Sequence, residues 1–310
     1  MNIKKIINKI PYLWLVALII NGTKKLIIPG FNGLSLYDVS AFFFKRLWQG
    51  SITTRAAALS FTFFLALFPA IIFFFTLIPY IPIHGFQDTL MTTLKNILPK
   101  EAYENALTTI LDIVKKQHGG LLSFGFIAAL YFSTSGISGI MNAFNVSVHV
   151  SESRTFFKQK LIAIQLILIL SVLIVLAISL ITAGTSFLHF MLREGFIHRH
   201  SSFLILIICK WIVIVALFFF ITSFLYYLGP ASNERFHFIS AGSTVATILF
   251  ILTSIGFNFY ISHFSHYNKL YGSIGALIII LLWIYINAIV LLIGFELNAS
   301  IRKAKQKKME

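Results

Sequence analysis

The side chains best placed to do chemistry in this 310-residue chain are the few charged groups in or beside its long apolar stretches. Glu296 is the only acidic residue inside these stretches, and Arg55 stands at the entrance to the first one. A carboxylate in hydrocarbon costs roughly 2 to 3 kcal/mol, so it persists mainly where a partner or a cavity meets it. We therefore predict that Arg55 and Glu296 face each other at one mouth of a helix bundle. A Glu296 wetted by lipid headgroups, without a partner, is the alternative.

Further polar groups inside the stretches are candidates for a polar pocket or for contacts between helices. Lys210 lies about seven residues into its stretch, so its stem can reach outward to the interface; the alternative is a lysine that lines a substrate path. The neutral candidates are Asn142, Asn258, Asn287 and the Ser133-Thr134-Ser135 run. Such groups join helices more often than they bind ligands.

Three residues have a predicted effect on the backbone. Pro69 leaves one carbonyl without its helical donor and should bend the first stretch. Gly272 and Gly275 allow a neighbouring helix to approach the last stretch closely.

Signatures of catalysis and of metal binding are weak. His263 and His266 are three positions apart and His198 and His200 are close together, but no carboxylate or cysteine cluster accompanies them. We therefore predict no metal site, no cofactor and no catalytic residue. Cys209, the single cysteine, cannot form an internal disulfide. The chain has no glycine-rich phosphate loop, nucleophile elbow or dinucleotide fingerprint, which disfavours a kinase or a primary pump.

The composition shows what must position these side chains. Hydrophobic residues make up 58% and charged residues 11%, against about a quarter charged in soluble proteins, and the mean hydropathy is +0.87. A helix needs roughly 20 apolar residues to cross a bilayer. Six stretches qualify, at 56–79, 119–143, 161–190, 203–228, 239–261 and 271–298. We predict an all-α, polytopic membrane protein, a bundle of six transmembrane helices.

Basic residues predict the orientation and the domains. Of the seven segments outside the stretches, the first, third, fifth and seventh together hold 17 Lys or Arg, and the second, fourth and sixth hold 7. We therefore expect both termini in the cytoplasm. The net charge of +15 sits beside the membrane, which favours lipid headgroups over nucleic acid as partners. We predict a basic amphipathic region at 1–55, a six-span domain at 56–299 and a basic cytoplasmic tail at 300–310.

Amphipathic helices are predicted outside the spans. Apolar residues at helical spacing between Ile3 and Ala17 indicate a helix on the inner leaflet, and a second lies between Leu36 and Trp48. A floppy basic leader is the alternative. The external loop 85–118 keeps a helical period that breaks at Pro99, so we expect two short helices there. They form either a lid or a layer packed on the span ends.

Several of these residues belong to sequence motifs that resemble those of the YihY/virulence factor BrkB family, whose members are often labelled ribonuclease BN-like. The pattern comprises residues 55–60, 67–69, 133–154 with Asn145, Glu152 and Arg154, 227–230, Gly242, 271–276, 282–285 and 294–298. The resemblance covers about residues 40 to 300. It implies a multi-pass protein of the bacterial inner membrane with six spans.

The resemblance implies several functions. Members carry the ribonuclease label, with tRNA processing implied, or are linked with virulence and serum resistance, or with envelope lipid transport or solute export. A nuclease needs clustered carboxylates or histidines on an RNA-accessible face. On the predicted cytoplasmic side the candidates are spread over separate flanks: Asp38, Glu152, Glu234 and Glu310, with His149 and His237. We therefore predict that the protein is not an enzyme.

Three hypotheses follow. The leading one is transport or handling of a lipid or another amphiphilic solute, through a polar pocket near Arg55, Asn287 and Glu296. The second is a membrane-anchored ribonuclease whose basic leader and tail contact RNA. The third is a non-catalytic scaffold that recruits envelope protein partners. The sequence leaves the oligomeric state open.

Overall fold

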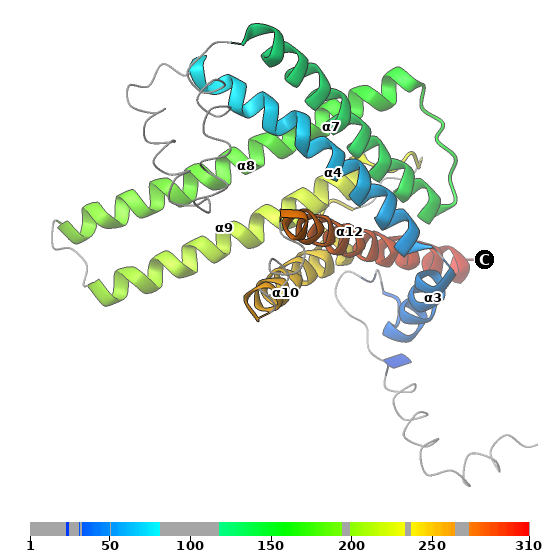
Figure 1. Ribbon diagram of the computed structural model, residues 1–310. Coiled ribbons are helices and arrows are strands. Elements are labelled where there is room, and N and C mark those ends of the chain that lie inside the picture. Colours follow the sequence, from blue (N-terminus) through cyan, green and yellow to red (C-terminus); the bar gives the residue numbers. More distant parts are fainter. Residues whose placement is uncertain are drawn as a thin grey trace, which may run out of the picture. The chain divides into compact units, whose positions relative to one another are not determined.

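Seven α-helices and one short 3₁₀ helix make up the part of the chain that the computed structural model describes, residues 23–24, 31, 33–49, 51–80, 118–193, 199–232, 237–263 and 273–309. The helices are α3 (Leu36–Gln49), α4 (Ile52–Leu77), η1 (Ile78–Tyr80), α7 (Gly119–Val148), α8 (Phe156–Arg193), α9 (Arg199–Leu228), α10 (Ala241–His263) and α12 (Ser273–Met309), drawn in Figure 1. The all-α prediction is confirmed. The amphipathic helices predicted before residue 20 and between residues 86 and 116 lie outside the described residues.

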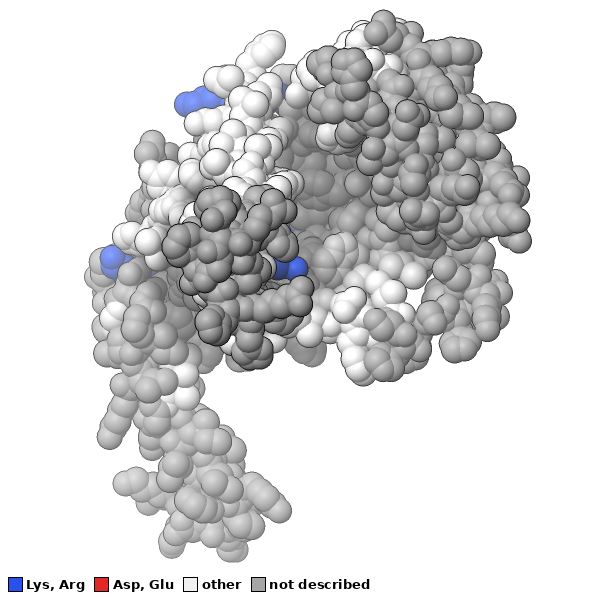
Figure 2. Space-filling view, turned by 90° about the vertical axis from the view of Figure 1, so that its left-hand side faces the viewer, with Lys and Arg blue, Asp and Glu red and all other residues white. Residues whose placement is uncertain are grey.

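Six of these helices are long and apolar enough to cross a membrane, as predicted. The apolar spans are Ile52–Thr76, Gly119–Val148, Phe156–Thr185, Leu204–Leu228, Ala241–Ile261 and Leu277–Lys307. Many large apolar side chains on their outer surfaces are exposed, among them Phe74, Phe124 and Leu168. On the face in Figure 2 a few of the described residues are Lys or Arg, and no Asp or Glu is visible. Large exposed apolar surfaces are what a lipid-facing helix presents. The protein is therefore a helical membrane protein.

The last helix is longer than the sequence pattern indicated. The predicted span ended at Asn298 and a separate basic tail followed, whereas α12 continues to Met309. It continues because Ile301 and Ala304, each 4% exposed, recur on one face and pack against α3. The basic residues between them lie on the other face, so the tail is an amphipathic extension of the span.

Contacts divide the chain into two compact units, and the larger one holds residues 1–59 and 138–310. In this unit α8 packs on α9, α9 on α10, α10 on α12, and α12 on α3, which lies against the C-terminal end of α12 (Figure 1). The rings of Phe218 on α9 and Phe250 on α10 stack with centroids 5.3 Å apart.

Three aromatic rings form the centre of this unit. Phe144 at the end of α7 stacks on Phe295 of α12 with centroids 4.1 Å apart, and Tyr226 of α9 lies 5.5 Å from both. The Tyr226 hydroxyl donates a hydrogen bond to the Leu291 carbonyl, 2.7 Å away. This bond satisfies the one polar atom that the cluster buries, so three helices meet there without an unpaired group.

The smaller unit, Ser60–Ile137, contains the rest of α4 and the first part of α7. These two helices pack through aromatic rings, with the centroids of Phe73 and Phe126 5.5 Å apart. Gly125 lets them approach, because a Cβ there would lie 3.1 Å from the Phe73 backbone nitrogen. The α4 helix continues through Pro69 without ending.

Candidate functional site

A buried ion pair joins three helices of the larger unit. Arg55 lies in the first turn of α4, and its Nη2 atom is 2.7 Å from Oε1 of Glu296 on α12. Its Nη1 atom donates to Ser147 Oγ at 2.7 Å and to the Ala143 carbonyl at 2.8 Å, both at the end of α7. The Ser147 hydroxyl in turn donates to Glu296 Oε1 at 2.7 Å. The two charges and the hydroxyl therefore form one closed network.

The burial of the pair determines what it does. The side chains of Arg55 and Glu296 are 11% and 2% exposed, so water contributes little to solvating either charge. A buried pair gives little net stability compared with apolar residues, but it becomes strongly unfavourable when one partner is removed. The network therefore fixes which ends of α4, α7 and α12 meet.

A second polar network ties together two connections between helices. Asn145 of α7 donates from Nδ2 to Glu152 Oε2 at 2.8 Å, and its Oδ1 accepts from the backbone nitrogen of Ala231 at 2.7 Å. Arg154 donates from Nε to Glu152 Oε1 at 2.7 Å and from Nη2 to the Gly229 carbonyl at 2.8 Å. The segment between α7 and α8 is thus joined to the segment between α9 and α10.

The charge on Glu152 is stabilised by this network. Partial burial acts to raise the pKa of Glu152, but the hydrogen bonds and charge of Arg154, with the Asn145 amide, outweigh it and lower that pKa below its ordinary value of 4.5. At neutral pH the Glu152 carboxylate is therefore ionised and accepts hydrogen bonds from Asn145 and Arg154. These bonds hold the turn between α7 and α8.

The helices α10 and α12 come into backbone contact near the same end of the bundle. A Cβ at Gly242 would overlap the Gly294 carbonyl oxygen, and a Cβ at Gly294 would lie 2.7 Å from the Gly242 carbonyl oxygen. The Asn298 side chain accepts from the Gly242 nitrogen at 2.8 Å and donates to Ser240 Oγ at 2.9 Å. Asn298 therefore satisfies a donor that the first turn of α10 leaves open.

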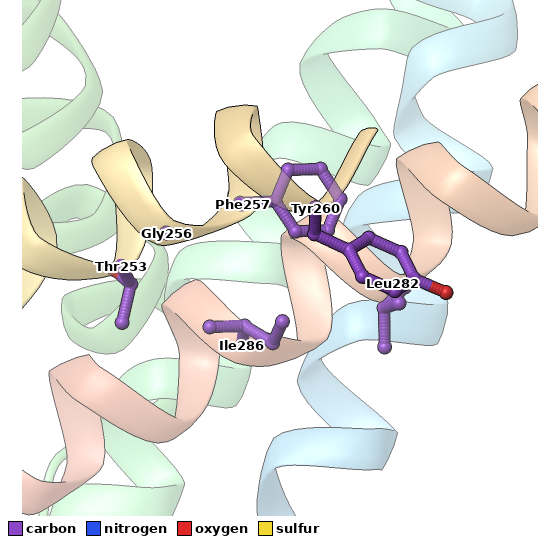
Figure 3. A pocket seen from close by; sticks show the side chains of 6 residues that line it. All are labelled: Thr253, Gly256, Phe257, Tyr260, Leu282 and Ile286. Carbon is purple, nitrogen blue, oxygen red and sulfur yellow. The ribbon is translucent and has the colours of Figure 1, made fainter. Parts of the chain in front are cut away.

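Toward the other end of α10 an apolar groove of about 470 Å³, open on one side, lies between the same two helices. Its lining, shown in Figure 3, is Thr253, Gly256, Phe257 and Tyr260 from α10 with Leu282 and Ile286 from α12. Gly256 provides the recess, since no atom lies within 4 Å of the place its Cβ would take. The Thr253 hydroxyl donates to the Leu249 carbonyl at 2.8 Å within its own helix, which leaves the groove with few polar groups.

Comparison with known proteins gives the family. The family described as Virulence factor BrkB matches residues 43–310, which span everything from the second half of α3 onward. The chain belongs to the BrkB family. The resemblance that the sequence motifs indicated is confirmed.

Several relatives of this BrkB-family protein are known by name. It is 31% identical to the ribonuclease-like protein YfkH of Bacillus subtilis over 85% of this chain and 94% of that protein. It is 24% identical to a UPF0761 membrane protein of Alteromonas mediterranea, over 88% of this chain and 90% of the relative. A UPF0761 membrane protein of Vibrio campbellii is 26% identical over 84% of this chain and 81% of its own length. No solved structure matches the chain.

Of the candidate residues predicted in this BrkB-family chain, the structure brings together Arg55 and Glu296. Asn287 lies nine positions before Glu296, about 14 Å along α12, and donates to the Trp283 carbonyl of its own helix at 2.7 Å. Asn142 is exposed and accepts from Gln159 Nε2 at 3.0 Å. Asn258 on α10 and Lys210 on α9 are exposed. The structure therefore does not place Asn287 in the pocket that we predicted around Arg55 and Glu296.

The remaining predicted residues are not members of the ion-pair network. Ser133 is half-buried on α7 in the smaller unit, and Gly275 is buried on α12. Gly272 falls outside the described residues. Ser147 was missed, because it lies past the predicted end of its stretch at residue 143 and a single serine has no local signal that identifies a network member.

Proposed function

We propose that this BrkB-family protein binds a lipid or another amphiphile in the membrane and moves it or presents it to a partner. The observation that carries the proposal is the apolar groove between α10 and α12. All six lining residues belong to the two apolar spans Ala241–Ile261 and Leu277–Lys307. A recess at that depth meets hydrocarbon rather than water, so its natural occupant is apolar.

The size and shape of the groove fit such an occupant. Its volume of about 470 Å³ lies within the range of about 300–1,000 Å³ typical of ligand sites. It is open on one side rather than enclosed, so an acyl chain enters laterally. The Phe257 ring lies 4.8 Å from that of Trp283, centroid to centroid, which gives the groove a rigid aromatic side.

The ion pair has a supporting role in this proposal. Glu296 lies ten positions after Ile286, about 15 Å further along α12. Arg55 and Ser147 hold that end of α12, while the half that lines the groove has mostly apolar neighbours. We propose further that both termini face the cytoplasm of the bacterial inner membrane, which puts the groove in the outer half of the bilayer.

A nuclease activity has less support. The name of the relative YfkH contains the word ribonuclease-like, but that name belongs to that protein. Of the three acidic residues that the structure describes, Glu152 and Glu296 are paired with Arg154 and Arg55, and the Asp38 carboxylate accepts a hydrogen bond from Ser35 Oγ at the start of α3. A nuclease needs carboxylates or histidines that can reach a metal ion or RNA.

The test fills the groove without disturbing the helices. Gly256→Leu places a side chain in open space, and Gly184→Leu is its matched control, because Gly184 also lies in a span with no atom near the position of its Cβ. In vesicles that contain a phospholipid with a photoreactive acyl chain, we expect labelling of α10 and α12 in the wild type. Gly256→Leu should reduce that labelling several-fold, and Gly184→Leu should leave it unchanged.

Two further measurements on the same preparations separate the alternatives. Fluorescent phospholipid in the vesicles reports movement between leaflets, which Gly256→Leu should slow. Equal labelling of Gly256→Leu and the wild type would rule out the groove as the site. Metal-dependent cleavage of tRNA precursors that Glu152→Gln abolishes would replace the lipid proposal with the nuclease.

A further inference from the structure

The last turns of α12 present a basic face that the lipid groove does not use. We define the basic face as Lys303 and Lys307, both of which are exposed; Lys305 is exposed as well, but lies about 160° around the helix from them. Ile301 and Ala304 of the same turns pack in one cluster with Val39 of α3, which is 1% exposed. Because that packing fixes the rotation of α12, Lys303 and Lys307 are held side by side at the surface.

The charges of the basic face have little compensation within the described residues. Lys303 and Lys307 are one helical turn apart, and like charges at that spacing destabilise a helix. Of the acidic groups that the structure describes, Asp38 accepts a hydrogen bond from Ser35 Oγ at the start of α3, while Glu152 and Glu296 are paired with Arg154 and Arg55. An external anion would relieve this repulsion.

The position of the basic face along α12 shows which anion it meets. Lys303 and Lys307 lie seven and eleven positions after Glu296, or about 10 and 16 Å further along a helix that is continuous with an apolar span. The headgroup layer adds only several Å to each side of a hydrocarbon core about 30 Å thick. Lysine stems of this length reach that layer.

The neighbouring helix α3 also presents an apolar residue outward. Phe44 is 67% exposed, although Phe42 and Phe43 on the same helix pack against the α12 cluster. Lys307 Nζ lies 5.7 Å from the centroid of the Phe42 ring, so the basic face and α3 form one surface. An exposed phenyl group on a helix that packs against the end of a span is typical of a lipid interface and is not needed to bind RNA.

We propose that the basic face of α12, with α3, binds the anionic headgroups of phospholipids. The phosphates of bound lipids pair with Lys303 and Lys307, and Phe44 of α3 enters the acyl layer. This surface is separate from the groove between α10 and α12, so the binding does not depend on the function proposed for that groove.

The experiment uses the full chain in a neutral detergent. Phosphatidylglycerol or phosphatidylcholine is titrated in, and bound lipid is measured by native mass spectrometry. Each lysine near a membrane surface contributes about fivefold in affinity, so Lys303→Gln/Lys307→Gln should weaken phosphatidylglycerol binding about 25-fold. Lys210→Gln is the matched control, because Lys210 is exposed on α9 in the middle of the chain and away from the basic face. It should bind like the wild type.

A salt titration, the Gly256→Leu variant and a competition with tRNA complete the experiment. Phosphatidylglycerol binding by the wild type should fall as salt rises, a test that needs no variant to fold. Gly256→Leu should keep this binding, which separates the basic face from the groove. Equal binding of the two lipids, or a double variant that binds like the wild type, would overturn the proposal. So would labelled tRNA that displaces phosphatidylglycerol from the wild type and loses affinity in the double variant.

Discussion

Arg55 and Glu296 are 241 positions apart in the sequence, and their side chains form an ion pair 2.7 Å long. Ser147 hydrogen-bonds to both of them, so the charges are shared among α4, α7 and α12. Because both charged side chains are nearly buried, neither can turn to water when the other is removed. The pair therefore behaves as one unit, and its members should be tested singly and together.

Single neutral substitutions of the pair should be more harmful than the double one. Glu296→Met or Arg55→Met leaves a buried charge without its partner, and we expect a loss of about 3–5 kcal/mol in stability. Arg55→Met/Glu296→Met removes both charges and should recover most of that loss. Thermal unfolding in detergent measures all three, and Lys210→Met, at an exposed position, is the control. A double variant as unstable as the sum of the singles would contradict a mutual pair.

The crossing of α10 and α12 should not tolerate a methyl group. In Gly294→Ala the added Cβ would overlap the Tyr226 hydroxyl oxygen and would lie 2.7 Å from both the Gly242 carbonyl oxygen and the Ala246 Cβ, and the backbone at Gly242 cannot move aside easily. We expect a loss of about 1–3 kcal/mol. Gly256→Ala is the matched control on the same helix pair, since its Cβ meets open space. Melting temperatures that fall equally in both variants would show that the close contact is not the cause.

The composition of the stretches sufficed to predict the fold class and the six spans, because hydropathy determines whether a helix can cross a bilayer. It could not predict which face of each helix is buried. A span such as α9 is apolar all round, so no periodic stripe separates the side toward α8 and α10 from the side toward lipid. Gly294 and Asn298 therefore have no signal of their own within their stretch, and Ser147 lies beyond the predicted end of its stretch at residue 143.

The candidate site was partly predictable for the same reason. Charges in hydrocarbon are so unfavourable that the pairing of Arg55 with Glu296 could be predicted from the sequence alone. Neutral polar residues have other solutions, as Asn287 shows by donating to the Trp283 carbonyl within its own helix. The groove could not be predicted at all, because Gly256 has no side chain that could mark a site, and its recess exists only beside Leu282 and Ile286.

The packing of α3 on α12 should contribute to stability. Val39 is 1% exposed, and Val39→Ala removes two methyl groups from its cluster, which should cost about 2 kcal/mol including the cavity. Phe44→Ala is the control, because Phe44 is 67% exposed on the same helix. In neutral detergent the melting temperature should fall for Val39→Ala and stay unchanged for Phe44→Ala. The reverse order would mean that α3 presents a different face to α12.

The connection between α7 and α8 should make the protein sensitive to acid. Hydrogen bonds and the charge of Arg154 lower the pKa of Glu152 below 4.5 in the folded protein, so its contribution to stability is complete above about pH 4.5 and is lost as the pH falls through the lowered pKa. Glu152→Gln should be less stable at pH 7 and should lose less on acidification.

Arg154→Gln should flatten the same profile, because it removes the group that lowers the pKa of Glu152. The measurement is the melting temperature in detergent from pH 7 to about pH 3, for the wild type and both variants. The difference between the wild type and Glu152→Gln should narrow toward the acidic end. A difference that stays constant over the whole range would mean that ionisation of Glu152 does not stabilise the turn, and that its hydrogen bond from Asn145 is sufficient.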